Sequence, residues 1–189
     1  MAPLSRPSRV FAWPVKALRR GVFAWGRTGP MERFVSTYTM RLDSKGRMSI
    51  PAPYRALIAR DGLEHVYCHP ALDLPALQAG GARLMAGIDA LIERYPPYSE
   101  AREELAGALY GAIEILKLDP EGRVMLSEGL KSRAHIRDEA VLVGLGDYFR
   151  IWEPGRFRAH LAEANAKVRA LKAEIGSRGA TGNTRVDGA

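Results

Sequence analysis

The hexapeptide Leu42-Asp43-Ser44-Lys45-Gly46-Arg47 recurs 76 residues later as Leu118-Asp119-Pro120-Glu121-Gly122-Arg123, and four of the six positions are identical. Neighbouring positions also agree in apolarity or charge when the two stretches are aligned. The matching pairs are Met48 with Val124, Ile50 with Leu126, Arg41 with Lys117 and Arg55 with Lys131. Because a repeated pattern with matching flanks indicates a repeated structure, the sequence predicts two equivalent units.

Each unit has the pattern of a strand, a tight turn, a second strand, a helix and a further strand. In the turn, an Asp at the first position can accept backbone hydrogen bonds, and a Gly at the fourth adopts positive φ without steric cost. In the second unit we expect strands at 113–118, 123–126, 140–143 and 148–152, and a helix capped by Ser127 that runs to about His135. In the first unit we expect strands at 35–42, 47–50 and 64–68, and a helix at 53–60.

A unit of about 40 residues buries too little surface to be stable alone. We therefore expect the two units to pair across a pseudo-twofold axis and to share one β core. The expected fold class is α+β, with tandem β-hairpin/helix repeats. This pairing would put both turns on one surface.

Helical patterns follow each repeat. Apolar residues recur at helical spacing between the repeats, and a second helix is expected at 99–109. After Pro154, an apolar stripe steps by three and four residues through Phe157, Leu161, Ala164, Val168, Leu171 and Ile175, and we expect it to pack on the body or on a neighbouring subunit. The expected organisation is a basic leader (1–30), a first repeat (31–76), a helical insert that starts at Leu77 (77–109), a second repeat (110–153), a C-terminal helix (154–175) and a flexible tail (176–189).

The charge is concentrated at the start of the chain. The 189 residues contain 28 Lys and Arg against 21 Asp and Glu, a formal charge of +7. Residues 1–30 hold six of the cations and no acid. Three interpretations stay open for this leader: an overextended reading frame with Met31 as the true start, a disordered basic arm that touches nucleic acid, or a targeting segment.

Two arginines directly follow the turns, where a rigid turn can hold a cation out from a β surface. The guanidinium groups of Arg47 and Arg123 could bond the two major-groove acceptors of guanine, and Lys45 could supply a charge for phosphate. Alternatively, the arginines pair with Asp43 and Asp119 and only stiffen the hairpins, because surface Arg–Asp pairs are common and weak. The spacing alone leaves both interpretations open.

Residues 42–51, Leu-Asp-Ser-Lys-Gly-Arg-Met-Ser-Ile-Pro, followed by Tyr54-Arg55, resemble the signature of the MraZ family of bacterial transcriptional regulators. Residues 118–126 are similar to the second repeat of that family, and the resemblance extends from about Met31 to Val168. It implies a SpoVT-AbrB-like fold whose hairpins intertwine into a small barrel. It also implies a ring homo-oligomer that binds tandem repeats of double-stranded DNA in the promoter of the division and cell-wall gene cluster and represses it.

The resemblance implies a set of site residues. The expected DNA contacts are Arg47, Arg123, Lys45, Arg41 and Lys117, and the residues that shape the turns are Asp43, Gly46, Asp119 and Gly122. The chain departs from the family pattern in two places within the motifs. Glu121 stands where the first repeat has Lys, so the second turn should bind phosphate less well, and Ser127 replaces the proline found at Pro51.

Other patterns do not suggest chemistry. The single cysteine excludes an intramolecular disulfide framework, and Cys68-His69 with His65 lacks the usual spacing of zinc ligands. Gly144-Leu145-Gly146 is expected to be a plain hairpin turn, because a strand follows it. No apolar run reaches the ~18–20 residues that span a bilayer. We therefore expect no enzyme activity, cofactor, metal, membrane contact or small-molecule substrate, and a cytoplasmic, nucleoid-associated protein. The alternative is an antitoxin-like protein-interaction module of the same fold.

Overall fold

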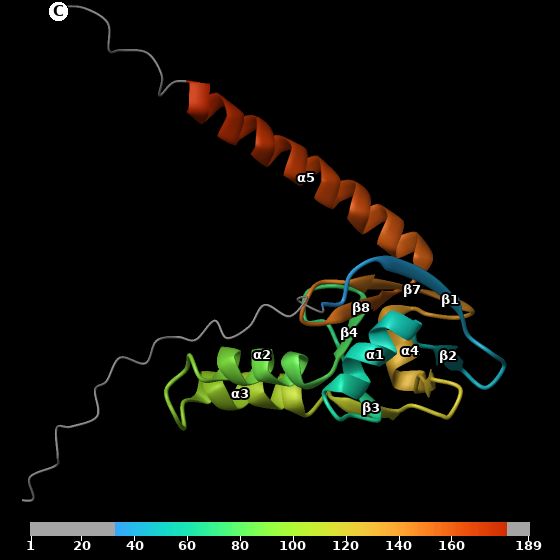
Figure 1. Cartoon of the computed structure of the whole chain (residues 1–189). Coiled ribbons are helices and arrows are strands. Elements are labelled where there is room, and N and C mark those ends of the chain that lie inside the picture. Colours follow the sequence, from blue (N-terminus) through green and yellow to red (C-terminus); the bar gives the residue numbers. More distant parts are fainter. Residues whose placement is uncertain (1–32, 181–189) are drawn as a thin grey trace, which may run out of the picture. The chain divides into compact units, whose positions relative to one another are not determined.

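The computed structural model describes residues 33–180, with side chains described as far as Lys172. The first repeat contributes β1 (Thr37–Arg41), β2 (Arg47–Ser49), α1 (Ala52–Arg60), β3 (His65–Pro70) and β4 (Ala76–Gly80). The second contributes β5 (Glu114–Lys117), β6 (Arg123–Met125), α4 (Glu128–Ala134), β7 (Glu139–Gly144) and β8 (Phe149–Trp152). Helices α2 (Ala82–Ile92) and α3 (Glu100–Tyr110) separate the repeats in the chain, and α5 (Pro154–Ala180) follows the second repeat (Figure 1).

Strand pairing interleaves the two repeats. The main sheet is antiparallel with the order β1-β7-β8-β4-β3-β5, and β2 pairs separately with β6. The equivalent strands of the two repeats are β1 and β5, β3 and β7, and β4 and β8. When each strand is replaced by its equivalent, the same order is obtained, read from the opposite edge of the sheet. Only the β3–β4 and β7–β8 pairs lie within one repeat, so neither repeat forms the sheet by itself.

The α+β class is confirmed and the sheet is antiparallel, but the expected small barrel is not confirmed, because the sheet does not close. β1 and β5 lie at the two ends of the strand order and do not pair with each other. The three-residue strands β2 and β6 pair with one another as a short ribbon instead of closing the sheet. The structure is therefore an open six-stranded sheet with an accompanying two-stranded ribbon.

The main core lies between the sheet, the ribbon and the two repeat helices. Met48 of β2 and Val124 of β6 are paired directly, and both side chains are buried. Ile58 of α1 and Leu130 of α4 join the same cluster. Burial of these side chains stabilises the fold by about 25 cal/mol for each Å² of apolar surface that is removed from water.

The two repeat helices begin in different ways. Pro51 precedes α1 with φ of −53° and makes no side-chain cap, whereas the hydroxyl of Ser127 accepts a hydrogen bond of 3.2 Å from the backbone N–H of Leu130 in α4. The replacement of proline by Ser127 therefore changes the helix start and preserves the helix. At their ends, Gly62 and His135 both have left-handed backbone, with φ of 74° and 56°.

The insert begins later than predicted, because Leu77 lies in strand β4 and not in a helix. Strand β4 is buried on both faces over most of its length, with only Gln78 partly exposed, so its burial shows no strand alternation. The seven-residue step from Leu77 to Leu84 therefore imitated helical spacing. Helices α2 and α3 pack on each other through a second cluster, formed by Leu84, Ile88, Ile92 and Leu109.

Helix α5 packs on the sheet only through its first turns. Trp152 stacks on His160 with ring centroids 4.7 Å apart, and Phe157 packs against the same tryptophan. Beyond these residues the apolar stripe is exposed, and Leu171 has 56% of its surface accessible. The helix continues to Ala180, five residues beyond the expected end, so part of the expected flexible tail is helical.

The predictions for the leader and for residues 181–189 lie outside the described residues. Among the residues that the structure describes, no helix is long and apolar enough to cross a membrane.

Candidate nucleic-acid interface

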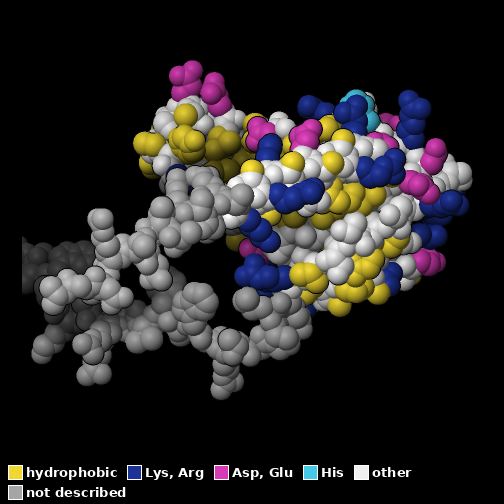
Figure 2. All heavy atoms as spheres, turned by 90° about the horizontal axis from the view of Figure 1, so that it is seen from above, with side chains coloured by type: hydrophobic (Ala, Val, Ile, Leu, Met, Phe, Trp, Pro, Cys, Tyr) yellow, Lys and Arg dark blue, Asp and Glu magenta, His cyan; other side chains and the backbone are white. Residues whose placement is uncertain are grey.

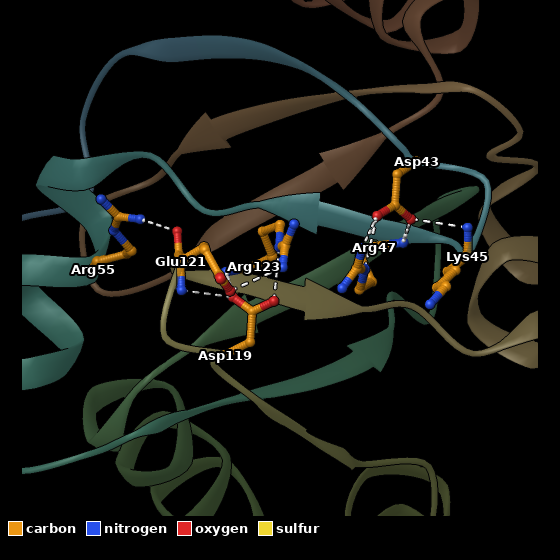
Figure 3. Close-up of polar contacts among 7 residues, drawn as sticks. All are labelled: Asp43, Lys45, Arg47, Arg55, Asp119, Glu121 and Arg123. Atoms are coloured by element: carbon orange, nitrogen blue, oxygen red, sulfur yellow. Dashed lines mark hydrogen bonds and ion pairs between the residues drawn. The ribbon is translucent and has the colours of Figure 1, made fainter.

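The β2–β6 ribbon presents both arginines on one face. Arg47 lies opposite Met125, and Ser49 lies opposite Arg123. Directly opposed residues point to the same side of a sheet and successive residues alternate. The inward positions are taken by the buried Met48–Val124 pair, so Arg47 and Arg123 lie on the outer face as diagonal neighbours (Figure 3).

Each arginine is preceded by a turn that its aspartate organises. One carboxylate oxygen of Asp43 accepts hydrogen bonds of 2.9 Å from the backbone N–H groups of Lys45 and Arg47. The N–H of Gly46 donates to the Asp43 carbonyl at 2.9 Å, and its φ of 76° is in the region that glycine adopts most easily.

The second turn repeats this geometry almost atom for atom. Asp119 accepts from the backbone N–H groups of Glu121 at 3.1 Å and Arg123 at 2.8 Å. Gly122 also has a φ of 76°. The two turns are therefore structural equivalents, as the repeated hexapeptide predicted.

The remaining carboxylate oxygens hold the guanidinium groups. Nε of Arg47 lies 2.7 Å from Oδ2 of Asp43, and Nε of Arg123 lies 2.7 Å from Oδ2 of Asp119. The backbone and side-chain hydrogen bonds from Arg47 lower the pKa of Asp43 to about 2. Partial burial would raise the pKa of Asp119, but the hydrogen bonds from Arg123 outweigh it and lower that pKa as well.

The internal Asp–Arg pairs of the alternative interpretation are thus present, but they do not sequester the arginines. The side chains of Arg47 and Arg123 keep 30% and 28% of their surface accessible. A guanidinium group has five N–H donors in a rigid fork. In Arg47, Nη2 also lies 2.7 Å from Oδ2 of Asp43, so the pair engages two nitrogens. The remaining donors are left to meet a ligand, while the pair limits the rotation of the group.

Helices brace the turns across the repeats. Nη1 of Arg55 in α1 donates a hydrogen bond of 2.9 Å to the backbone carbonyl of Glu121 in the second turn (Figure 3). Nζ of Lys131 in α4 lies against Gly46 of the first turn, 3.2 Å from where a Cβ would stand. Arg55 and Lys131 occupy equivalent positions in the two repeats. Their matching positive charge was the feature of the sequence that could have identified them as site residues. Sequence reasoning did not assign them to the site.

The other three residues that we expect to contact DNA are exposed and lie near the ribbon. Lys45 is exposed in the first turn, and Lys117 is exposed on edge strand β5. Arg41 is 86% exposed and pairs with Glu139 of the adjacent strand β7, with Nε and Oε1 3.0 Å apart. The pairing reduces the charge that Arg41 adds.

On the described face that Figure 2 presents, Lys and Arg side chains are interspersed with Asp and Glu. A mixed surface attracts a polyanion weakly, so any affinity for DNA has to come from few contacts or from repetition of them.

The residues that resembled a reactive site are structural. Cys68 is fully buried in β3, and burial raises the pKa of its thiol. Within the described part of the chain no cluster of His, Cys, Asp and Glu could hold a metal ion. Gly146, with φ of 89°, belongs to the turn between β7 and β8.

Comparison with known proteins identifies the family. Residues 109–175 match the family model described as "MraZ protein, putative antitoxin-like". The transcriptional regulator MraZ of Azorhizobium caulinodans is 67% identical over 147 residues, which are 78% of this chain and 94% of that protein. The chain belongs to the MraZ family. MraZ of Xanthobacter autotrophicus is 66% identical over the same shares of both chains, and that of Rhizobium meliloti is 34% identical over 76% of this chain and its own full length.

Membership defines the broad class of activity. The MraZ relatives at these identities are named transcriptional regulators, so this MraZ chain is a transcription regulator. The matched residues of the family model cover the second repeat and α5 as far as Ile175.

Proposed function

We propose that this MraZ protein regulates transcription by binding double-stranded DNA through the outer face of the β2–β6 ribbon. The observation that carries the proposal is the geometry of Arg47 and Arg123, which lie on one outward face with their Nε atoms held by equivalent aspartates. A guanidinium held in this way can bond the two acceptors of a guanine edge or a phosphate. The interleaved hairpins support assignment of the repeats to the SpoVT-AbrB-like class.

The target that we propose is a set of tandem repeats in the promoter of the division and cell-wall gene cluster, which the protein represses. Residues 31–189 carry 22 cations and 21 acids, so one subunit offers few net charges to DNA. A ring that presents the same ribbon repeatedly would gain affinity when the operator spacing matches the subunit spacing. The mixed charge of the surface therefore favours binding by an oligomer.

Gel shift with single-site substitutions tests the DNA proposal. Arg47→Ala should weaken binding to DNA from upstream of the gene by about 1–3 kcal/mol, and operator DNA reduced to a single repeat should bind much more weakly than the tandem form. Arg169→Ala is the matched control, because it removes the same charge from the exposed side of α5. Retention of full affinity by the folded Arg47→Ala variant would reject the proposal.

Helix α5 supports the proposed self-association. Its stripe residues Leu161, Val168 and Leu171 are 43%, 49% and 56% exposed, so they do not pack on the body of the same chain. An exposed apolar stripe on a long helix is typical of a contact with another helix. Val168→Asp should lower the mass of the assembly in sedimentation, whereas Lys167→Asp should not. Equal masses for the two variants would exclude the stripe from the subunit interface.

A second candidate function rests on the same helix. An antitoxin-like interaction module would use an extended segment to hold a partner protein, and the exposed stripe of α5 could serve that purpose. Co-purification of a stoichiometric small protein that is lost in the Val168→Asp variant would favour this function. Co-purification of nucleic acid that is lost in the Arg47→Ala variant would favour DNA binding.

A further inference from the structure

The two turns have the same backbone and opposite charge. The first hexapeptide contains one acid and two cations, a formal charge of +1, and the second contains two acids and one cation, a formal charge of −1. The difference lies at one equivalent position, Lys45 in the first turn and Glu121 in the second. Both side chains are exposed, so their charges face solvent.

Glu121 acts on the arginine of its own turn. Its Oε2 lies 2.9 Å from Nη2 of Arg123, while Nε of Arg123 is bound by Asp119. Arg123 therefore has one carboxylate on Nε and a second on Nη2. On Arg47 both Nε and Nη2 lie against Asp43, which is its only carboxylate among the described residues. A phosphate that approached Arg123 would have to displace Glu121 or stand beside its negative charge.

The contacts that the two repeat helices make with the turns also differ. Arg55 donates its hydrogen bond to the main chain of the second turn at Glu121. Lys131, its equivalent, lies against the first turn and forms its ion pair with Glu128 of its own helix. Across the ribbon the two turns are held alike, because the carbonyl of Gly46 accepts from the N–H of Leu126 at 3.1 Å and the carbonyl of Gly122 accepts from the N–H of Ile50 at 3.0 Å. The difference is that a helix donates a side-chain hydrogen bond to the backbone of the second turn, whereas α4 only packs on the first turn.

We propose that the first turn is the DNA-contacting turn of each subunit, and that Glu121 keeps the second turn off the DNA. The inference rests on the proposed DNA binding and adds a specificity-determining residue to it. Lys45 and Arg47 face the phosphate backbone or a base edge, and Asp119, Glu121 and Arg123 form a closed ion network that supports the ribbon. Glu121 prevents an otherwise equivalent turn from competing for the same duplex.

The first test compares the two arginines and removes the Glu121 charge. Arg47→Ala should weaken binding at least about tenfold, and Arg123→Ala less than about threefold. Glu121→Gln keeps the shape of the side chain and removes its charge, and it should tighten binding about threefold to fivefold at low salt, with the gain shrinking as salt is added. Glu104→Gln, which makes the same charge change on exposed α3, is the control and should have little effect.

The sharper test exchanges the two charges. The double variant Lys45→Glu with Glu121→Lys has the same net charge and the same turn backbones as the original protein. In this background, alanine at position 123 should now weaken binding more than alanine at position 47. A reversal of the ranking would show that the charge at this one position selects the turn.

The outcomes separate this inference from the proposed function. Equal losses for Arg47→Ala and Arg123→Ala, or a Glu121→Gln affinity equal to that of Glu104→Gln, would overturn the inequality of the turns while DNA binding by the ribbon stands. An unchanged ranking in the charge-exchanged variant would overturn it as well. If neither arginine substitution weakens binding by the folded protein, the proposed function falls, and this inference with it.

Discussion

Arg55 and Glu121 join the two repeats: Nη1 of Arg55 donates a hydrogen bond of 2.9 Å to the backbone carbonyl oxygen of Glu121. The helix of the first repeat thereby holds the turn of the second repeat. The arginine lies so close above Gly122 that a Cβ at that position would overlap with its guanidinium group. The second turn, its Gly122 and helix α1 therefore form one structural unit, so a substitution in one of them should change the effect of a substitution in another.

Gly122→Ala should destabilise the fold by about 1–3 kcal/mol in urea unfolding, because alanine at φ of 76° is strained and its methyl group meets Arg55. Gly107→Ala in α3 is the matched control: its Cβ would meet nothing within 4 Å, so it should stabilise the helix by about 0.5–1 kcal/mol. Adding Arg55→Ala to Gly122→Ala should recover part of the loss. A double variant whose loss is the full sum of the single losses would show that the two residues do not interact.

The Asp43–Arg47 pair should make stability depend on acid pH. The pKa of Asp43 is about 2 in the folded protein, against an ordinary value of 3.8. A carboxyl whose pKa is lowered by folding contributes stability above the unfolded value and loses it as pH falls through the folded value. Asp43→Asn should therefore be less stable than the original protein at pH 6, and the two should converge between about pH 4 and pH 2. Unfolding curves measured across this range check the prediction, and a difference that does not change with pH would contradict it.

His135→Gly should raise stability by about 0.5–1 kcal/mol. His135 ends α4 with a left-handed φ of 56°, a backbone conformation that is unfavourable for a side chain with a Cβ. The first repeat has Gly62 in the same role, with φ of 74°. Thermal unfolding measures the change, and Ser132→Gly inside α4 is the control that should destabilise. A loss of stability in His135→Gly would mean that the histidine side chain makes a stabilising contact.

Cys68 should be inert to thiol reagents in the folded protein. Its side chain is fully buried in β3, and burial raises the pKa of the thiol, so almost no thiolate is available. Reaction with a disulfide reagent should therefore occur only on unfolding, and its rate should follow the unfolded fraction as urea is increased. Fast labelling in the absence of denaturant would show that β3 opens locally.

Local interactions made much of the site predictable. Asp43 and Arg47 are four residues apart, and the contacts between them depend only on the backbone of one turn. The same holds for Asp119 and Arg123, which is why one hexapeptide could predict both turns. Ser127 as a helix cap was predictable for the same reason, because the capped N–H of Leu130 is three residues away.

Contacts between distant residues were not predictable in the same way. Helical spacing assigned Leu77 to the insert, but the residue lies in β4, where burial against β3 and β8 determines the structure. The expected small barrel was not confirmed either, since nothing in the spacing of apolar residues says whether the two edge strands meet. Arg55 was recognised as a counterpart of Lys131, although neither was placed beside a turn.

The amino-acid sequence by itself determined that there are two repeats, that each carries an Asp-organised turn, and that an arginine follows each turn. The tertiary structure decided that the turns share one ribbon, that each is braced by the helix of the other repeat, and that Glu121 lies on Arg123. The reason is physical: hydrogen bonds within a turn are set by a few neighbouring dihedral angles. The pairing of β2 with β6 in one ribbon, by contrast, depends on burying apolar faces that are 76 residues apart in the chain.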